Sequence, residues 1–124
     1  TEQEEAETGE ESPGLGVNEV LYELMGDSDK LGELTRLVGR LTDAVETQDE
    51  TLVKETQDEI SILARHLPEN HEIIRLTQAA RAGGDRGAKL AGLYLQRCFH
   101  LIAEEYVKLG QVEDEIQSLE AGAS

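Results

Sequence analysis

Several residue types that shape many folds are scarce in this sequence. Its 124 residues contain no Trp, one Phe, three Tyr, one Cys and two Pro. A single Cys excludes an internal disulfide, and the shortage of aromatic residues means that a core must be built from Leu, Ile, Val and Ala. The alternation of apolar and polar residues that is typical of a half-buried strand is also missing. The sequence therefore predicts an all-α protein.

Long hydrophobic runs are absent too. No stretch of eighteen consecutive apolar residues is present, as a transmembrane helix would require. The chain also does not open on the basic and then apolar segment of a secretory signal. With 38% hydrophobic residues, it has enough for one modest core. We therefore expect one soluble, cytoplasmic domain that does not bind a membrane.

Basic residues are few, and they are scattered singly. The chain has 11 Lys and Arg against 27 Asp and Glu, which gives a formal net charge of −16. Such a charge repels nucleic acid, and no basic patch offsets it, so direct nucleic-acid binding is not expected. The acidity has three possible explanations: an ordinary solvated surface with an acidic tail, adaptation to a salty cytoplasm, or mimicry of nucleic-acid phosphates by an inhibitor.

The beginning of the chain differs in composition from the rest. Six of the acidic residues lie in the first twelve positions, and residues 1–16 are poor in hydrophobic residues and punctuated by Gly and Pro. Such a segment buries too little apolar surface to offset the entropy lost on ordering. We therefore predict a disordered acidic tail over 1–16 and a helical domain over 17–121.

Apolar residues at spacings of three and four predict helices along most of the domain. A short helix is expected from Val17 to Met25, and longer helices over 28–48, 49–67 and 71–82. The residues expected to pack are Val17, Val20, Leu21 and Leu24 in the first, Leu31, Leu34, Val38, Leu41 and Val45 in the second, and Ile73, Ile74, Leu76 and Ala80 in the fourth. Thr47 and Glu50 have the spacing of a capping box at the start of the third helix. Gly32 and Gly39 stand inside the second helix, where close approach of a neighbouring helix would explain them.

The last third of the chain carries a seven-residue ladder of apolar residues. Ala88, Leu95, Ile102, Leu109 and Ile116 stand seven apart, and Ala91, Cys98, Val112 and Leu119 follow three residues after members of that set. The ladder predicts one long helix of coiled-coil type from Asp85 to Ala121, which completes a four-helix bundle-like domain. That helix is longer than the others can cover, so we predict that it pairs with a second copy in a homodimer, or with another protein.

The residues predicted to contact the partner are Leu95, Ile102, Glu105, Leu109, Val112, Ile116 and Leu119. Glu105 interrupts the ladder, and a buried carboxylate is costly unless it is paired or solvated. There are three possibilities: the interface splays at Glu105, Phe99 and Tyr106 take over the packing there, or this carboxylate fixes the register or meets an Arg or Lys of the partner.

A second geometry is open for the same segment. Phe99, Ile102, Ala103, Tyr106 and Gly110 are placed like the aromatic, Leu, Gly, Tyr and Gly positions of a tetratricopeptide repeat. The resemblance covers less than half of the chain, and Glu115 replaces the expected Ala. It implies a helical hairpin with a break at Gly110 in place of one long helix.

No motif predicts a catalytic residue, a metal site or a cofactor. The segment from His71 to Arg75 begins like the zinc-protease motif, but Arg75 stands where the second His is required. His100 and Glu104 share a helix face but provide only two ligands. Cys98 lies in the apolar ladder and is predicted to be a core residue.

Acidic residues on two predicted helices resemble those of the all-helical nucleotide pyrophosphatases, which hold magnesium with carboxylates from several helices. The residues in question are Glu55, Asp58 and Glu59 on one helix and Glu104, Glu105, Glu113, Asp114 and Glu115 on another. Their spacing departs from the Glu-Glu-x-x-Glu and Glu-x-x-Asp pattern of that family. The sequence thus favours a non-catalytic interaction module, such as a scaffold, adaptor or regulatory subunit. A nucleotide hydrolase and a nucleic-acid mimic are the alternatives.

Overall fold

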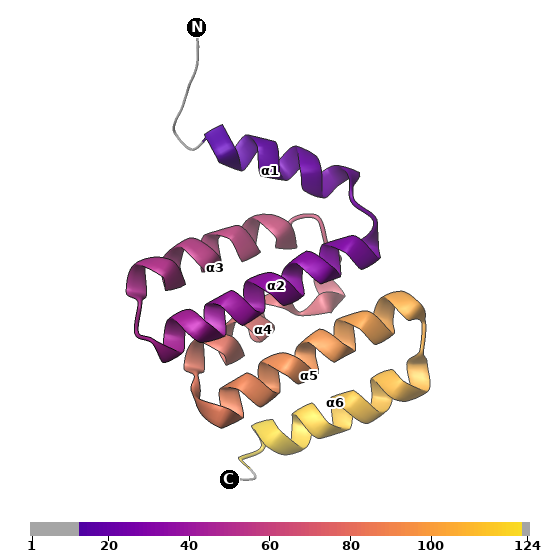
Figure 1. Cartoon of the computed structure of the whole chain (residues 1–124). Coiled ribbons are helices and arrows are strands. Elements are labelled where there is room, and N and C mark those ends of the chain that lie inside the picture. The colour runs from indigo at the N-terminus through magenta and orange to yellow at the C-terminus, as the bar shows by residue number, and fades with distance from the viewer. Residues whose placement is uncertain (1–12, 123–124) are drawn as a thin grey trace, which may run out of the picture.

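A computed structural model describes residues 13–122 of the chain (Figure 1). These residues form six α-helices, a single 3-10 turn and no strand, which confirms the all-α class. The elements are α1 (Pro13–Leu24), α2 (Asp27–Glu46), α3 (Glu50–Ala64), the 3-10 turn Glu69–His71, α4 (Ile73–Ala82), α5 (Gly84–Ala103) and α6 (Tyr106–Glu120). In this range, no helix is both long enough and apolar enough to span a membrane.

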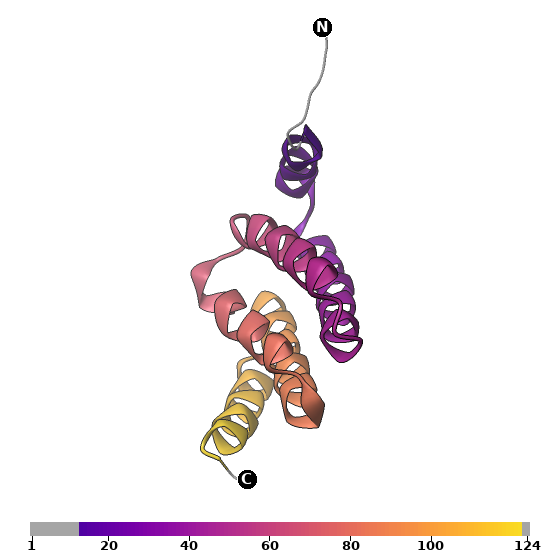
Figure 2. The ribbon, with the colours of Figure 1, turned by 90° about the vertical axis from the view of Figure 1, so that its left-hand side faces the viewer.

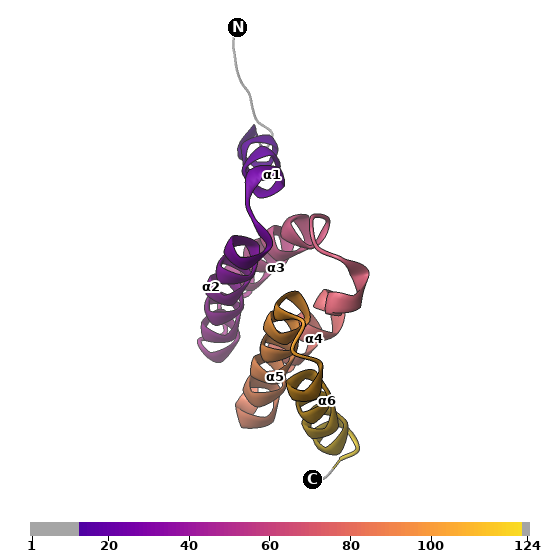
Figure 3. The same cartoon turned by 90° about the vertical axis from the view of Figure 1, so that its right-hand side faces the viewer.

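Successive helices pack side by side. The pairs α2 and α3, α4 and α5, and α5 and α6 are in extensive contact, and α2 also packs against α4 and α5 (Figures 1 and 2). Helix α6 covers the side of α5 that faces away from α2, and α1 lies at the opposite edge of the molecule against α3 (Figure 3). The fold is therefore a stack of helical hairpins with a single helix added at the N-terminal edge.

The core lies where α2 meets α3, α4 and α5. In α2 the predicted stripe is confirmed, since Leu31, Leu34 and Leu41 are fully buried and Val38 is nearly so. Leu63 of α3 is also fully buried. Each such side chain stabilises the fold by about 1.5–3 kcal/mol relative to exposure, so α2 is the central helix of the domain.

The break between α2 and α3 lies where the sequence predicts it, but a different residue caps the new helix. Gln48 has a positive φ of 60°, and the Asp49 carboxylate accepts a hydrogen bond from the Leu52 amide at 3.1 Å. The expected cap, Thr47, instead donates its hydroxyl to the Asp43 carbonyl at 3.0 Å. Asp49, and not Thr47, caps α3 because Thr47 is still hydrogen-bonded within the last turn of α2.

The single long helix predicted from Asp85 to Ala121 is instead two helices, α5 and α6. Glu104 has a φ of 58°, in the left-handed region, and the Glu105 amide bonds back to the His100 carbonyl at 2.9 Å. The chain folds back because this buries Val112 and Ile116, which are 5% and 6% exposed, in the same molecule. The break is not at Gly110, which lies inside α6.

The start of the first helix and the surroundings of two glycines also differ from expectation. Residues 13–16, assigned to the tail from the sequence, form the first turn of α1, and residues 1–12 lie outside the described range. Gly32 and Gly39 face open space, so they allow no close helix approach. The glycine that does allow one is Gly87, where an added Cβ would lie 2.6 Å from the Ala79 carbonyl oxygen of α4.

Candidate protein-docking groove

The apolar residues predicted to bind a partner are used within the chain. Val112 and Ile116 are buried, Leu95, Ile102 and Leu119 are partly buried against the core, and Leu109 is partly buried. Glu105 is exposed as the first residue before α6, where its carboxylate bonds to His100 Nδ1 at 2.9 Å. This hydrogen bond lowers the pKa of Glu105. Its role in the structure is thus to close the turn between α5 and α6.

Polar contacts also fix α6 onto α5. The Tyr94 hydroxyl donates to the Glu120 carboxylate at 2.6 Å, and Arg97 Nε donates to Glu113 at 3.1 Å. Arg86 donates to the Leu119 carbonyl oxygen at 2.7 Å near the end of α6. Because both apolar and polar contacts hold α6 along its length, the predicted seam is free for a partner only if α6 detaches.

Cys98 of α5 and His71, the last residue of the 3-10 turn, form a buried pair. The Cys98 thiol is fully buried and donates to the His71 carbonyl oxygen at 3.3 Å. Burial raises the pKa of Cys98 to about 12. Burial is also the main cause that lowers the pKa of His71, and the nearby Arg97 guanidinium adds to it. Both groups are therefore neutral at pH 7 and play a structural part.

The Cys98 thiol is expected to react slowly with a thiol reagent in the native protein at pH 7 and rapidly in denaturant. The reason is that the thiolate is the reactive form and both burial and the raised pKa suppress it. Labelling followed by mass spectrometry, with and without urea, measures the ratio of rates. Rapid native labelling at neutral pH would instead indicate a reactive cysteine.

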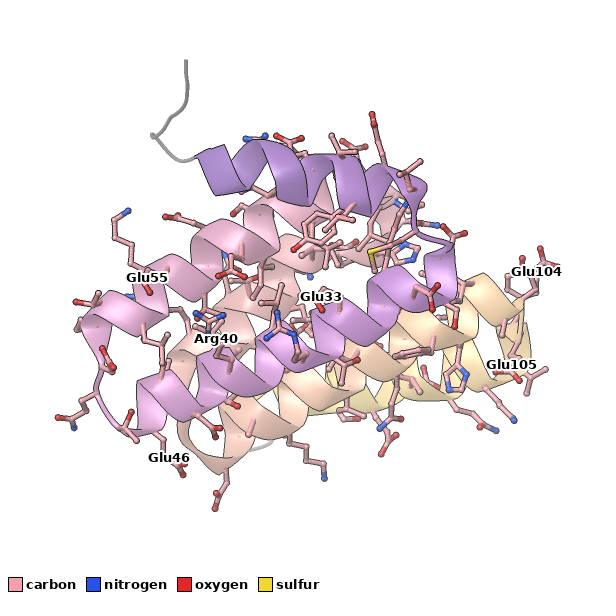
Figure 4. All side chains as sticks on the ribbon, turned by 45° about the horizontal axis from the view of Figure 1, so that its top comes forward. Glu33, Arg40, Glu46, Glu55, Glu104 and Glu105 are labelled. Carbon is pink, nitrogen blue, oxygen red and sulfur yellow. The ribbon has the colours of Figure 1, made fainter. Side chains whose placement is uncertain are left out.

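The carboxylates proposed for a magnesium site are not brought together. Glu55 on α3 lies at one end of the molecule, and Glu104 and Glu105 lie at the other (Figure 4). Within the described range, no group of three or more His, Cys, Asp or Glu side chains could hold a metal ion.

A groove with an apolar floor lies between α3 and α4 and has a volume of about 590 Å³. It exists because α3 packs mainly on α2 and touches α4 at few places. Ile60 and Ile73, which are 1% and 8% exposed, line it together with Ala64. Ile74 stands at its edge with 75% of its surface exposed.

The two ends of this groove differ in charge. At one end Arg81 donates to the Gln57 side chain at 2.8 Å and so links α4 to α3. Beyond Ile74, the groove continues into a second hollow of about 330 Å³, whose lining includes Glu69 and Glu72. The groove therefore has an apolar floor, a basic end and an acidic end.

A second apolar surface lies on α1. Val20, Leu21 and Leu24 are 56%, 53% and 79% exposed, although they form the stripe expected from the sequence to pack. Among residues 19–24 of α1, the buried one is Tyr22, whose ring makes an edge contact with His66 at a centroid distance of 6.1 Å. Helix α1 is thus attached to the molecule by its other face.

Compared with protein-family models, with curated proteins and with solved structures, the chain matches none of them.

Proposed function

We propose that the protein is a non-catalytic interaction module that binds an apolar helical segment in the groove between α3 and α4. The exposure of Ile74 beside an apolar floor carries the proposal. A large aliphatic side chain at 75% exposure gains about 1–2 kcal/mol when it is covered. A groove of about 590 Å³ has room for several side chains of a partner.

A helix is the favoured form of the bound segment. The groove runs between two helices, and a third helix can lay residues at positions i, i+3 or i+4 and i+7 along such a trough. The charges at the ends set its direction, because an acidic group of the segment is favoured near Arg81 and a positive group near Glu69 and Glu72.

The test compares three chains: the wild type, Ile74→Glu in the groove, and Val107→Glu as a matched control. Val107 is 78% exposed on α6, so both changes place a carboxylate on the surface and leave the core intact. Helical peptides selected from a library for binding to the wild type should bind Ile74→Glu at least about tenfold more weakly, which is about 1.4 kcal/mol. They should bind Val107→Glu unchanged, as measured by calorimetry.

Equal binding of the selected peptides to the wild type and to Ile74→Glu would contradict the proposal. The alternatives have separate readouts. A nucleotide hydrolase would turn over nucleotides when magnesium is added, and a nucleic-acid mimic would compete with DNA for a basic protein.

A further inference from the structure

We infer that the segment which occupies the groove is α1 of a second copy of the chain. The inference rests on the proposed function, since it names the partner of the same groove. Its basis is that the described structure leaves two apolar surfaces uncovered that fit one another: the groove beside Ile74 and the stripe of Val20, Leu21 and Leu24.

The two surfaces agree in size. Helix α1 has 12 residues and α4, which forms one wall of the groove, has 10. At 1.5 Å per residue these lengths are about 18 Å and about 15 Å. Val20 and Leu24 are four residues apart and Leu21 and Leu24 are three apart, so the three side chains lie along one side of α1 as a groove-bound helix requires.

Apolar contact, and not charge, favours the pairing of α1 with the groove. Residues 13–18 carry no charged side chain, but Glu10 and Glu11 directly precede α1 in the sequence, and Glu23 stands near its other end. Both ends of α1 are therefore acidic, so Glu69 and Glu72 favour neither direction of α1 in the groove.

Helix α1 can make this contact without leaving its own molecule. Its attachment to α3 uses Tyr22 and the ion pair of Glu19 with Arg65 at 3.0 Å. On a helix of 3.6 residues per turn, positions 19 and 22 lie roughly opposite the exposed stripe. A two-fold dimer in which each α1 enters the groove of the other copy buries both uncovered surfaces, which is the closed arrangement favoured for self-association.

Net charge opposes this dimer and supplies a test of it. Each copy carries −16, and salt screens the repulsion between surface charges while leaving apolar contacts in place. The sedimentation mass of the full chain should therefore rise from monomer toward dimer as protein concentration rises. At a fixed protein concentration it should also rise with salt.

Two variants and one control locate the contact. The double change Leu21→Asp with Leu24→Asp alters the stripe, Ile74→Glu alters the groove, and Val107→Glu alters neither. All of these positions are exposed, and melting curves check that each variant is folded. Each of the first two variants should remain monomeric, whereas the control should dimerise like the wild type.

A stricter test is to mix the stripe variant, Leu21→Asp with Leu24→Asp, with the groove variant, Ile74→Glu. The groove variant keeps a wild-type α1 and the stripe variant keeps a wild-type groove, so the mixture should form pairs that neither variant forms alone. Loss of dimer in the stripe variant together with an unchanged dimer in Ile74→Glu would overturn the inference, because α1 would then pair with α1.

A further outcome separates this inference from the proposed function. If the wild type is monomeric at every concentration and salt, while selected helical peptides still bind in the groove, the second copy is the wrong partner and the groove still binds helices. If the peptides also bind Ile74→Glu as tightly as the wild type, they do not bind in the groove, and the proposed function is wrong.

Discussion

Replacing Ile116 with Asp is expected to lower the free energy of unfolding by about 3 kcal/mol or more. Ile116 is 6% exposed between α6 and α5. The change loses about 1.5–3 kcal/mol of apolar burial, and it adds the cost of taking a carboxylate out of water between two packed helices. Urea denaturation followed by helical signal measures the loss.

The same variant tests where the apolar ladder is used. Val107→Asp, on the exposed side of the same helix, should change stability by no more than about 0.5 kcal/mol. At equal concentration and salt, Ile116→Asp should sediment with the same mass as the wild type. A smaller mass with little loss of stability would show that α6 packs on a second copy, as the sequence suggested.

Gly87→Ala is expected to destabilise the protein by about 1–3 kcal/mol. The added methyl group would lie 2.6 Å from the Ala79 carbonyl oxygen, so the backbones of α4 and α5 must separate. This cost of overpacking exceeds the gain of up to about 1 kcal/mol that Ala brings to a helix. Thermal unfolding of the variant measures the balance.

Gly39→Ala is the matched control, because it makes the same chemical change at a helical glycine where no atom of another helix lies within 4 Å of the new Cβ. This variant should be more stable than the wild type by about 0.5–1 kcal/mol. If both variants gain stability, the close approach of α4 and α5 at Gly87 is incorrect.

Most of the helical structure could be predicted from local patterns. The stripe of α2 and the break after it were predicted because spacing on a helix and turn-forming residues are local signals. The seven-residue ladder misled for a physical reason. It shows which residues would share one face if the helix were continuous, but it does not show that Glu104 takes a left-handed conformation. That cost is small beside the burial of Val112 and Ile116.

The candidate groove could not be predicted from the sequence. Ile73 and Ile74 are adjacent and equally apolar, and both were expected to pack, yet one is 8% exposed and the other 75%. The difference depends on where α3 lies relative to α4, which the pattern of either helix alone does not contain. The same holds for the stripe on α1, because Tyr22 takes the buried position in place of Leu21.

The order in which helices pack along the chain has a consequence for the rate of folding. Three of the main packing pairs join helices that follow each other directly in sequence. The longer-range pairs are α1 with α3 and, more extensive, α2 with α4 and α5. Contacts of short sequence separation need little loop closure, so such topologies fold in microseconds to milliseconds. The contacts that form when α2 docks onto the α4–α5 hairpin should therefore form last. Substitutions at these contacts should slow folding more than substitutions at the contacts between α5 and α6.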